Sequence, residues 1–353
     1  MIPEFLDEDK ISAVHSLTGK VLKTGWKVIE KAKFKPGSTG GNFSVCYIVE
    51  RDGKIGFLKA LNILSFIKDD NPDLLEAMTL GLNTFNYEKE ILIRCKSKNL
   101  SKVSKLIEAE QENFPGYIVA NVFYLIFEKA DGDVRNHLNF TSLVDDAWKL
   151  RSLHNIATGI KQLHNIDTSH QDLKPSNVFI FDKVVSKVGD LGRSLCETLT
   201  SPHSGMDFSG DQRYAPPEVF HRYVLPDWKD KVFAIDCYLL GSMACFYFTG
   251  QSMTALLSQK LDRSINILSL NFDNSLPYWF MAFEEALEII KEHTKDIDGQ
   301  TQLIEGIKML CFPDPRKRGH FKNVQGIGNN YQMDRFVELF NLLACKAELK
   351  LTR

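Results

Sequence analysis

No pair of cysteines in this 353-residue chain has the C-x-x-C spacing that zinc ribbons and thioredoxin-like redox sites use. The cysteines number seven, which is odd, and they are scattered from Cys46 to Cys345. This distribution argues against both a zinc site and a disulfide framework. Free thiols suit a reducing cytosol, so we expect a cytoplasmic protein.

The chain also lacks an excess of either charge, because 43 Lys and Arg residues face 45 Asp and Glu residues. Proteins that bind nucleic acid or anionic membranes generally carry a basic excess. We therefore expect neither partner. The first ten residues, MIPEFLDEDK, carry acids where a signal peptide has basic residues and then an apolar core.

No apolar run is long enough to suggest a membrane span. The most apolar stretch, residues 233–248, is too short to cross a bilayer and contains Asp236. We interpret it as a buried helix. The overall composition, 44 % hydrophobic and 25 % charged, is typical of a folded globular protein, and the length suffices for one large domain or two lobes.

The first part of the chain is predicted to be rich in β-strands. Residues 1–25 form a short extension with one amphipathic helix, because Ile11, Val14, Leu17 and Val21 recur at helical spacing. Strand-prone residues then dominate 26–59, where Asp52-Gly53 is a strong hairpin signal. A helix is expected over 71–95, and further strands over 117–119 and 123–127.

After Asp131-Gly132 the pattern becomes helical. The apolar stripe over 143–163 predicts a long helix, with Thr141 or Ser142 as its N-cap. Further helices are expected over 233–248, 277–291, 301–310 and 333–349. The fold class is α+β, with a small antiparallel β-sheet lobe and a larger α-helical lobe.

The strongest chemical signal lies in residues 170–177, which read H-Q-D-L-K-P-S-N and are followed by Asp190-Leu191-Gly192. This pair of motifs resembles the catalytic loop and the D-F-G motif of the eukaryotic-type protein kinase superfamily. The resemblance implies a bilobal fold with an N-lobe at 26–130 and a C-lobe at 131–325. Residues 326–353 would form a C-terminal helix on or after the C-lobe.

The resemblance assigns roles to the loop residues. Asp172 would orient the attacking hydroxyl and accept its proton, and Lys174 would neutralise the moving γ-phosphate. Asn177 and Asp190 would hold Mg²⁺, since hard oxygen ligands suit this ion. A Lys at position 174 marks Ser/Thr specificity in the family. The cofactors implied are ATP and Mg²⁺.

Upstream, Gly56-Phe57-Leu58-Lys59 resembles the family's V-A-I-K strand, so Lys59 would hold the α- and β-phosphates. Glu88 lies in a helical stretch that matches the family's αC helix, and it would pair with Lys59. Glu90 is the rival partner. We favour Glu88 because Leu92, four residues later, suits the inward helix face.

A loop between two strands, residues 37–44, loosely resembles the glycine-rich loop that covers ATP phosphates in the family. Its candidate residues are Gly37, Gly40, Gly41 and Ser44, with Ser44 standing where a third glycine is expected. A simple hairpin turn is the alternative interpretation.

The adenine would lie against the connection between the lobes. The resemblance implies that backbone groups of Glu128 and Ala130 bind the adenine edge, and that Val178 and Phe179 form an apolar floor. Asp133 would reach the ribose.

Motifs further along extend the resemblance to residues 26–319. Residues 213–218 resemble Y-x-A-P-E, Asp236 opens a D-x-W-S-L-G-like stretch, and residues 314–318 match D-P-x-x-R. The family pattern implies a buried ion pair between Glu218 and Arg318. It also implies that Asp236 holds the backbone of the catalytic loop.

Besides Ser44, and Leu191 in place of the Phe of D-F-G, three positions depart from the pattern. Gln171 replaces an Arg that in the family grips a phosphorylated activation segment, which predicts activity independent of phosphorylation between Asp190 and Glu218. Asp211 stands where a Thr usually contacts the loop Lys, so this acid would attract Lys174 or repel phosphate. Phe57 replaces a small Ala and narrows the nucleotide pocket.

Together these features predict an ATP-dependent Ser/Thr protein kinase whose partner is a protein substrate. Two alternatives remain open. The first is a pseudokinase that binds partners without transfer, against which Lys59, Glu88, Asp172, Asn177 and Asp190 are all present. The second is a small-molecule kinase, against which the 214–218 segment and its Arg partner argue.

Overall fold

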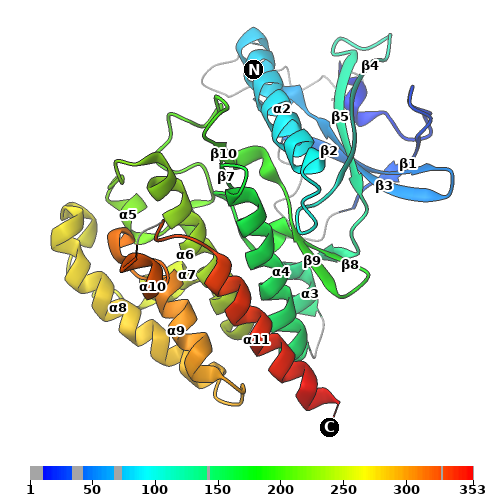
Figure 1. Cartoon of the computed structure of the whole chain (residues 1–353). Coiled ribbons are helices and arrows are strands. Elements are labelled where there is room, and N and C mark those ends of the chain that lie inside the picture. The colour runs from blue at the N-terminus through cyan, green and yellow to red at the C-terminus, as the bar shows by residue number, and fades with distance from the viewer. Residues whose placement is uncertain (1–10, 34–42, 67–73, 141–143, 327–328, 353) are drawn as a thin grey trace. The chain divides into compact units, whose positions relative to one another are not determined.

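The computed structural model describes residues 11–33, 43–66, 74–140, 144–326 and 329–352 (Figure 1). The chain divides into two compact units. The first unit comprises Met1–Asn99 and Ser104–Asp131, and the second comprises Leu100–Val103 and Gly132–Arg353. A β-rich first unit and a helical second unit confirm the predicted α+β class.

A five-stranded antiparallel sheet forms the framework of the first unit, in the order β1-β2-β3-β5-β4. Its strands are β1 (Lys27–Lys31), β2 (Ser44–Arg51), β3 (Lys54–Leu61), β4 (Leu106–Asn113) and β5 (Asn121–Glu128). The hairpin predicted at Asp52-Gly53 is confirmed, because Arg51 pairs with Lys54 across it. Both turn residues have positive φ, 54° and 72°, as a type I′ turn requires.

Strand β4 was not anticipated from the sequence, and the strand expected at 117–119 is wrong. The β4 sequence, LIEAEQEN, is rich in glutamate and lacks a strong strand signal, yet it pairs with β5 along the sheet edge. A charged edge strand discourages pairing with other chains. Residues 115–118 instead form a turn in which Gly116 has φ 101°, and Val119 makes an isolated bridge to Ser12.

The amphipathic helix expected within residues 1–25 does not form over residues 12–25, where Val14, Leu17 and Val21 lie; Ile11 is helical, and residues 1–10 lie outside the described residues. A 3₁₀ turn, η1 (Ala13–His15), follows Ser12. The chain then continues through turns, and the Ala13 amide donates to the carbonyl of Val119 at 3.1 Å. Gly19, at φ 83°, interrupts any helix, and Val21 is 62 % exposed.

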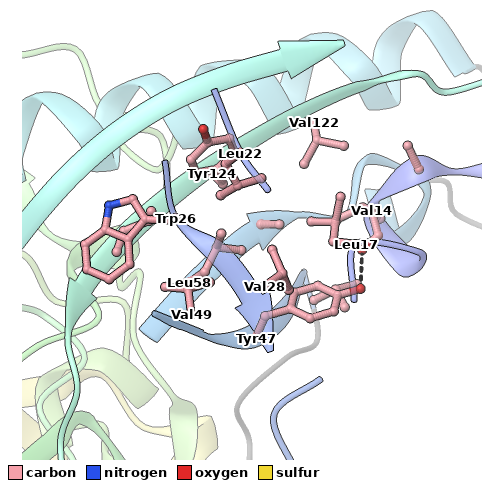
Figure 2. Packing of buried hydrophobic residues seen from close by; sticks show 14 residues of the cluster. Val14, Leu17, Leu22, Trp26, Val28, Tyr47, Val49, Leu58, Val122 and Tyr124 are labelled. Atoms are coloured by element: carbon pink, nitrogen blue, oxygen red, sulfur yellow. Dashed lines mark hydrogen bonds between the residues drawn. The ribbon is translucent and has the colours of Figure 1, made fainter. Parts of the chain in front are cut away.

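The same N-terminal segment helps to build the core of the first unit (Figure 2). Val14, Leu17 and Leu22 pack with side chains of one sheet face, among them Leu58 and Tyr124. The Tyr47 hydroxyl donates to the carbonyl of Val14 at 2.7 Å, so its polar end is satisfied inside the core (Figure 2). Residues 11–25 therefore complete the sheet rather than extend from it.

Helix α2 (Leu74–Ser97) fulfils the helix expected over 71–95 for the residues described. Phe85 of α2 contacts Phe123 of β5, with ring centroids 5.7 Å apart. Phe123 alternates with the buried residues Val122 and Tyr124, so α2 packs on the sheet face opposite the core cluster. This places Glu88 of α2 against the sheet.

The second unit is built from helices and two small sheets. The helices are α3 (Val134–Phe140), α4 (Asp146–His164), α5 (Pro217–Phe220), α6 (Trp228–Thr249), α7 (Met253–Lys260), α8 (Phe272–His293), α9 (Gln300–Leu310), α10 (Phe321–Val324) and α11 (Asp334–Leu351). The small sheets have the orders β6-β8-β9 and β10-β7. Their strands are β6 (Gly132–Asp133), β7 (Thr168–Ser169), β8 (Val178–Phe181), β9 (Val185–Val188) and β10 (Leu195–Cys196).

The N-cap of α4 differs from the prediction. Asp145 caps the helix, because its carboxylate accepts from the amide of Trp148 at 2.7 Å. The expected caps, Thr141 and Ser142, lie outside the described residues. Asp is as good an N-cap as Ser or Thr, so residue type alone could not choose among them.

Helix α6 is longer than the apolar stretch suggested. It spans 22 residues, Trp228–Thr249, between the N-cap Asp227 and the C-cap Gly250, which has φ 73°. The expectation that it is too short to cross a membrane is therefore wrong, since its length and composition alone would allow a span. However, 83 % of its most apolar window is buried, which is typical of a core helix.

Helix α11 packs along α4 in the second unit (Figure 1). Phe336, Phe340 and Leu343 are fully buried on its inner face, as the sequence predicts. At the polar rim, the Arg151 guanidinium binds the Glu348 carboxylate through two contacts of 2.8 Å. The C-terminal helix is thus part of the second unit's core.

A buried ion pair links α5 to the segment that follows α9. Arg318 donates to both carboxylate oxygens of Glu218, at 2.7 and 2.8 Å, and also to the carbonyls of Ala234 and Phe312. Arg318 is fully buried and Glu218 nearly so. Both charges of this pair are therefore compensated in the protein interior. Removing one partner would leave the other charge buried and uncompensated.

We expect Arg318→Met to lower the free energy of unfolding by about 3–5 kcal/mol, because it strands the Glu218 carboxylate. Urea unfolding followed by circular dichroism measures this loss. Lys295→Met is the control: both side chains of its ion pair with Glu292 are exposed, so it should change the free energy of unfolding little. Equal losses in both variants would contradict the assignment.

Candidate active site

A single buried carboxylate fixes the loop that carries the H-Q-D-L-K-P-S-N motif. Asp236 of α6 accepts from the backbone amides of His170, at 2.8 Å, and Gln171, at 2.9 Å. His164 Nε2 lies 2.9 Å from the same carboxylate. Gln171 adopts a left-handed backbone, φ 64°, which this anchoring maintains.

Burial alone would raise the pKa of Asp236. The hydrogen bonds from His164 and from the Gln171 amide, together with nearby charge, instead hold that pKa below its usual value of 3.8. Asp236 is therefore ionised in the folded protein at neutral pH. Its negative charge supports the loop at the point where the chain turns toward Asp172.

Three donors converge on the carboxylate of Asp172, which is itself buried. Lys174 Nζ lies 2.9 Å from Oδ2 and donates to Oδ1 at 3.1 Å. Asn177 Nδ2 donates to Oδ2 at 2.9 Å, and the backbone amide of Asp211 donates to Oδ1 at 2.9 Å. The orientation of the Asp172 carboxylate is therefore fixed from three directions.

Asn177 directly precedes β8, and Asp190 follows β9, the strand that pairs with β8 in the second unit. The Asn177 side chain uses its amide nitrogen to bind Asp172, which turns the carbonyl oxygen Oδ1 the other way. That oxygen accepts a long hydrogen bond, 3.4 Å, from Ser176 Oγ. The amide of Gly189, the residue before Asp190, donates to the Asn177 carbonyl at 2.9 Å. Asp190 is exposed and has a left-handed backbone, φ 58°.

This donor set fits Mg²⁺, which prefers hard oxygen ligands and keeps several waters. Among the described residues, no group of three or more His, Cys, Asp or Glu side chains could hold a metal by itself. An Asn oxygen and one carboxylate would therefore need phosphate oxygens and water to complete the coordination, as is usual for Mg²⁺ at nucleotides.

In the first unit, Lys59 of β3 forms an ion pair with Glu88 of α2. Lys59 Nζ lies 2.9 Å from Oε1 and 3.1 Å from Oε2 of Glu88, which is nearly buried. The rival Glu90 points elsewhere and lies 3.9 Å from Arg94. The preference for Glu88 over Glu90 is thus confirmed for the ion pair itself.

The remaining predicted nucleotide contacts divide between the units. Gly37, Gly40 and Gly41 lie outside the described residues, while Ser44 opens β2 opposite Leu61. Glu128 ends β5, where its amide donates to the carbonyl of Lys105 at 3.1 Å, and Ala130 follows in the connection to the second unit.

In the second unit, Asp133 of β6 pairs with Phe179 of β8. Phe179 is half-buried there, beside the fully buried Val178. The Asp133 carboxylate accepts from the backbone amide of Asn136 at 2.8 Å and from its side chain. Asp133 therefore supports the start of α3, in addition to any contact it makes with a ligand.

Gln171 turns its side chain inward. Its Nε2 donates to Ser169 Oγ at 2.7 Å and to the carbonyl of Val232 at 2.9 Å, and the residue is buried. Gln171 stands where the family has an Arg that binds phosphate. Its side chain instead makes hydrogen bonds inside the second unit.

The six Ser and Thr residues between Asp190 and Glu218 fall into two groups. Three are buried, namely Ser194, Ser201 and Ser209. Three others are exposed, namely Thr198, Thr200 and Ser204. Only the second group is accessible to a modifying enzyme in this conformation.

Asp211 departs from the family pattern in the sequence, but its ion-pair partner, Arg213, could be identified only in the structure. Arg213 binds Asp211 through Nε at 3.0 Å and Nη2 at 2.7 Å. Burial would raise the pKa of Asp211, but the hydrogen bonds from Arg213 and the charge of Lys174 lower it to about 2. The D-x-R spacing at the start of η5 (Gln212–Tyr214) was the available signal.

We expect Asp236→Asn to lower the free energy of unfolding at pH 7 by about 2–3 kcal/mol, because the amide cannot accept all the hydrogen bonds of the charged group. The pKa of Asp236 is depressed on folding, so its contribution is present above pH 3.8 and is lost as the pH falls further. The difference between wild type and variant should therefore narrow on acidification below that pH.

Urea titrations at pH 7 and pH 3 measure this narrowing. Asp296→Asn, at an exposed position, is the control and should change stability little at either pH. A difference between wild type and Asp236→Asn that stays constant from pH 7 to pH 3 would contradict an ionised Asp236.

The sequence of this chain is similar to those of known proteins. The family model described as "Protein kinase domain" matches residues 40–325. "Serine/threonine-protein kinase SSN3" of Candida albicans is 26 % identical over 278 residues, covering 73 % of this chain and 41 % of that protein. "Serine/threonine-protein kinase chk-1" of Caenorhabditis briggsae is 30 % identical over 193 residues, covering 51 % and 36 %.

"Receptor-like protein kinase FERONIA" of Arabidopsis thaliana is 30 % identical over 200 residues, covering 54 % of this chain and 20 % of that protein. The chain spans less than half the length of each of these three relatives. The family in general takes ATP as substrate and uses Mg²⁺. With the match to residues 40–325 and the loop geometry around Asp172 agreeing, the chain belongs to the protein kinase domain family.

Proposed function

We propose that this chain is an ATP-dependent Ser/Thr protein kinase, which transfers the γ-phosphoryl group of ATP to a hydroxyl of a protein substrate. The observation that carries the proposal is the Asp172 carboxylate, held by Lys174, Asn177 and the Asp211 amide. Phosphoryl transfer needs positioning and charge neutralisation more than covalent help from the enzyme, and this arrangement offers both.

In this proposal Asp172 orients the substrate hydroxyl and accepts its proton late in the reaction. Lys174, already in contact with Asp172, neutralises charge on the transferred group. Asn177 and Asp190 would hold Mg²⁺, which when bound neutralises the phosphates. Lys59, held by Glu88, binds the α- and β-phosphates.

Separate observations support the Ser/Thr preference and the protein substrate. Lys174 is the loop residue that marks Ser/Thr specificity in the family, and the names of two relatives carry the same specificity. The 213–218 segment, fixed through the Glu218–Arg318 pair, offers a place for a substrate peptide. A cytoplasmic location is supported by the seven cysteines, all of which are free thiols.

We also propose that activity does not depend on phosphorylation of the activation segment. Gln171 lacks the charge needed to bind a phosphate dianion, and its amide already donates to two buried oxygens. The segment has internal anchors instead. The Glu197 amide donates to the carbonyl of Asp167, and Ser209 donates to the carbonyl of Arg193.

Replacing Asp172 tests the proposed chemistry. We expect Asp172→Asn to lower phosphoryl transfer by about 10²–10⁴-fold, since the amide cannot accept the proton, while ATP still binds. Transfer of radiolabel from γ-labelled ATP into a protein extract measures activity, and calorimetry measures ATP binding. Asp182→Asn, in an exposed turn, is the matched control and should behave as wild type.

The same assay separates the alternatives. Wild-type protein that binds ATP but transfers no label would indicate a pseudokinase. Label that enters metabolites rather than protein would indicate a small-molecule kinase. Either result would overturn the proposed function.

Removing the exposed acceptors tests independence from phosphorylation. The triple variant Thr198→Ala, Thr200→Ala, Ser204→Ala should keep wild-type activity, because the uncharged Gln171, whose amide already donates to two buried oxygens, cannot pair with a phosphate dianion. The substrate-phosphorylation rate is compared after phosphatase treatment, with mass spectrometry to verify the phosphorylation state. Loss of activity in the triple variant, with its fold intact by circular dichroism, would contradict the proposal.

A further inference from the structure

The ammonium of Lys174 lies between two carboxylates. It contacts Asp172 at 2.9 Å and lies 3.5 Å from Oδ2 of Asp211. All three side chains are largely buried, so their charges interact in a medium less polar than water. Asp211 therefore competes with Asp172, and with any incoming phosphate, for the same ammonium.

Arg213 offsets this competition. Its guanidinium forms two contacts with Asp211, at 3.0 and 2.7 Å, in the bidentate geometry that makes Arg–carboxylate pairs strong. The backbone amide of Arg213 donates to the same carboxylate at 3.1 Å. Asp211 is thus both the cap of η5 and one half of an ion pair.

The four side chains form a charge-balanced set of two acids and two bases. Asp211 also touches Asp172 directly, because its backbone amide donates to Oδ1. That backbone contact does not depend on which side chain stands at position 211. The negative charge of Asp211 is therefore a separate influence on Lys174, and Arg213 is the residue that balances it.

We infer that Arg213 is a positioning residue: by pairing with Asp211, it prevents that carboxylate from capturing Lys174 and leaves the ammonium with Asp172. This inference rests on the proposed function for its consequence in catalysis. Without Arg213, the Asp211 charge would draw Lys174 away and would repel the transferred phosphoryl group. Arg213 itself is 70 % exposed on its side chain, so its removal leaves the core intact.

A double-mutant cycle tests the coupling. We expect Arg213→Ala to lower kcat about 10-fold, equivalent to about 1.4 kcal/mol of transition-state stabilisation, with little change in KM for the protein substrate. Asp211→Asn keeps the helix cap but removes the charge. Adding Arg213→Ala to Asp211→Asn should therefore cause no further loss.

A conservative variant and a control variant complete the test. Arg213→Lys should restore part of the activity, because a lysine supplies the charge but not the bidentate geometry. Arg263→Ala removes another exposed arginine, away from this set, and should leave kcat unchanged. A loss from Arg213→Ala that is the same with Asp or Asn at position 211 would overturn the inference.

A second measurement does not need enzyme activity. Crystal structures of the variants report which carboxylate Lys174 Nζ contacts. In Arg213→Ala, Nζ should move toward Asp211 and away from Asp172, because the uncompensated Asp211 attracts the ammonium more strongly. In the double variant Asp211→Asn, Arg213→Ala, Nζ should keep its contact with Asp172.

Lys174 that stays with Asp172 in Arg213→Ala would overturn the inference whether or not the protein transfers phosphate. Lys174 that leaves Asp172 in the double variant as well would also overturn it, because loosening of the segment would then explain the movement. If wild type transfers no phosphate but Nζ shifts only in Arg213→Ala, the proposed function fails while the arrangement around Lys174 stands. If the protein transfers phosphate but Nζ does not shift, the proposed function stands and the inference fails.

Discussion

The candidate active site depends on one buried negative charge. Asp236 sits on the core helix α6 and holds two successive backbone amides of the catalytic loop. An ionised carboxylate inside a protein is costly unless hydrogen bonds satisfy it, and here the amides and His164 do so. The loop is therefore fixed to a mostly buried helix, and this contact helps to position Asp172.

Much of this arrangement was visible in the sequence, because short motifs with fixed chemistry leave few alternatives. The spacing of Asp172, Asn177 and Asp190 identified the loop, and helical periodicity alone favoured Glu88 over Glu90 as partner of Lys59. The long helices were also predictable, since the apolar faces of α4 and α11 repeat at helical spacing. In each case one local pattern determines one structural outcome.

The features that the sequence did not predict depend instead on contacts between segments that are distant in the chain. Strand β4 has little intrinsic strand preference and exists because β5 offers it a pairing edge. The residues near Val14 showed helical periodicity, yet residues 12–25 form no α-helix, because they close the sheet core and Ser12 pairs with Val119. Arg213 was missed for a related reason, since its importance comes from the acid at position 211, itself a departure from the family pattern.

The segments outside the matched range also determine which fragments of the chain can be expected to stay soluble. Trimming it to the matched range, residues 40–325, would remove Leu17 and Trp26 from beneath the sheet and α11 from the surface of α4. Both newly bared surfaces are apolar, and large exposed apolar patches promote aggregation. A laboratory that designs a minimal catalytic fragment from family boundaries should thus recover insoluble material, and a fragment that keeps residues 11–352 retains both covers.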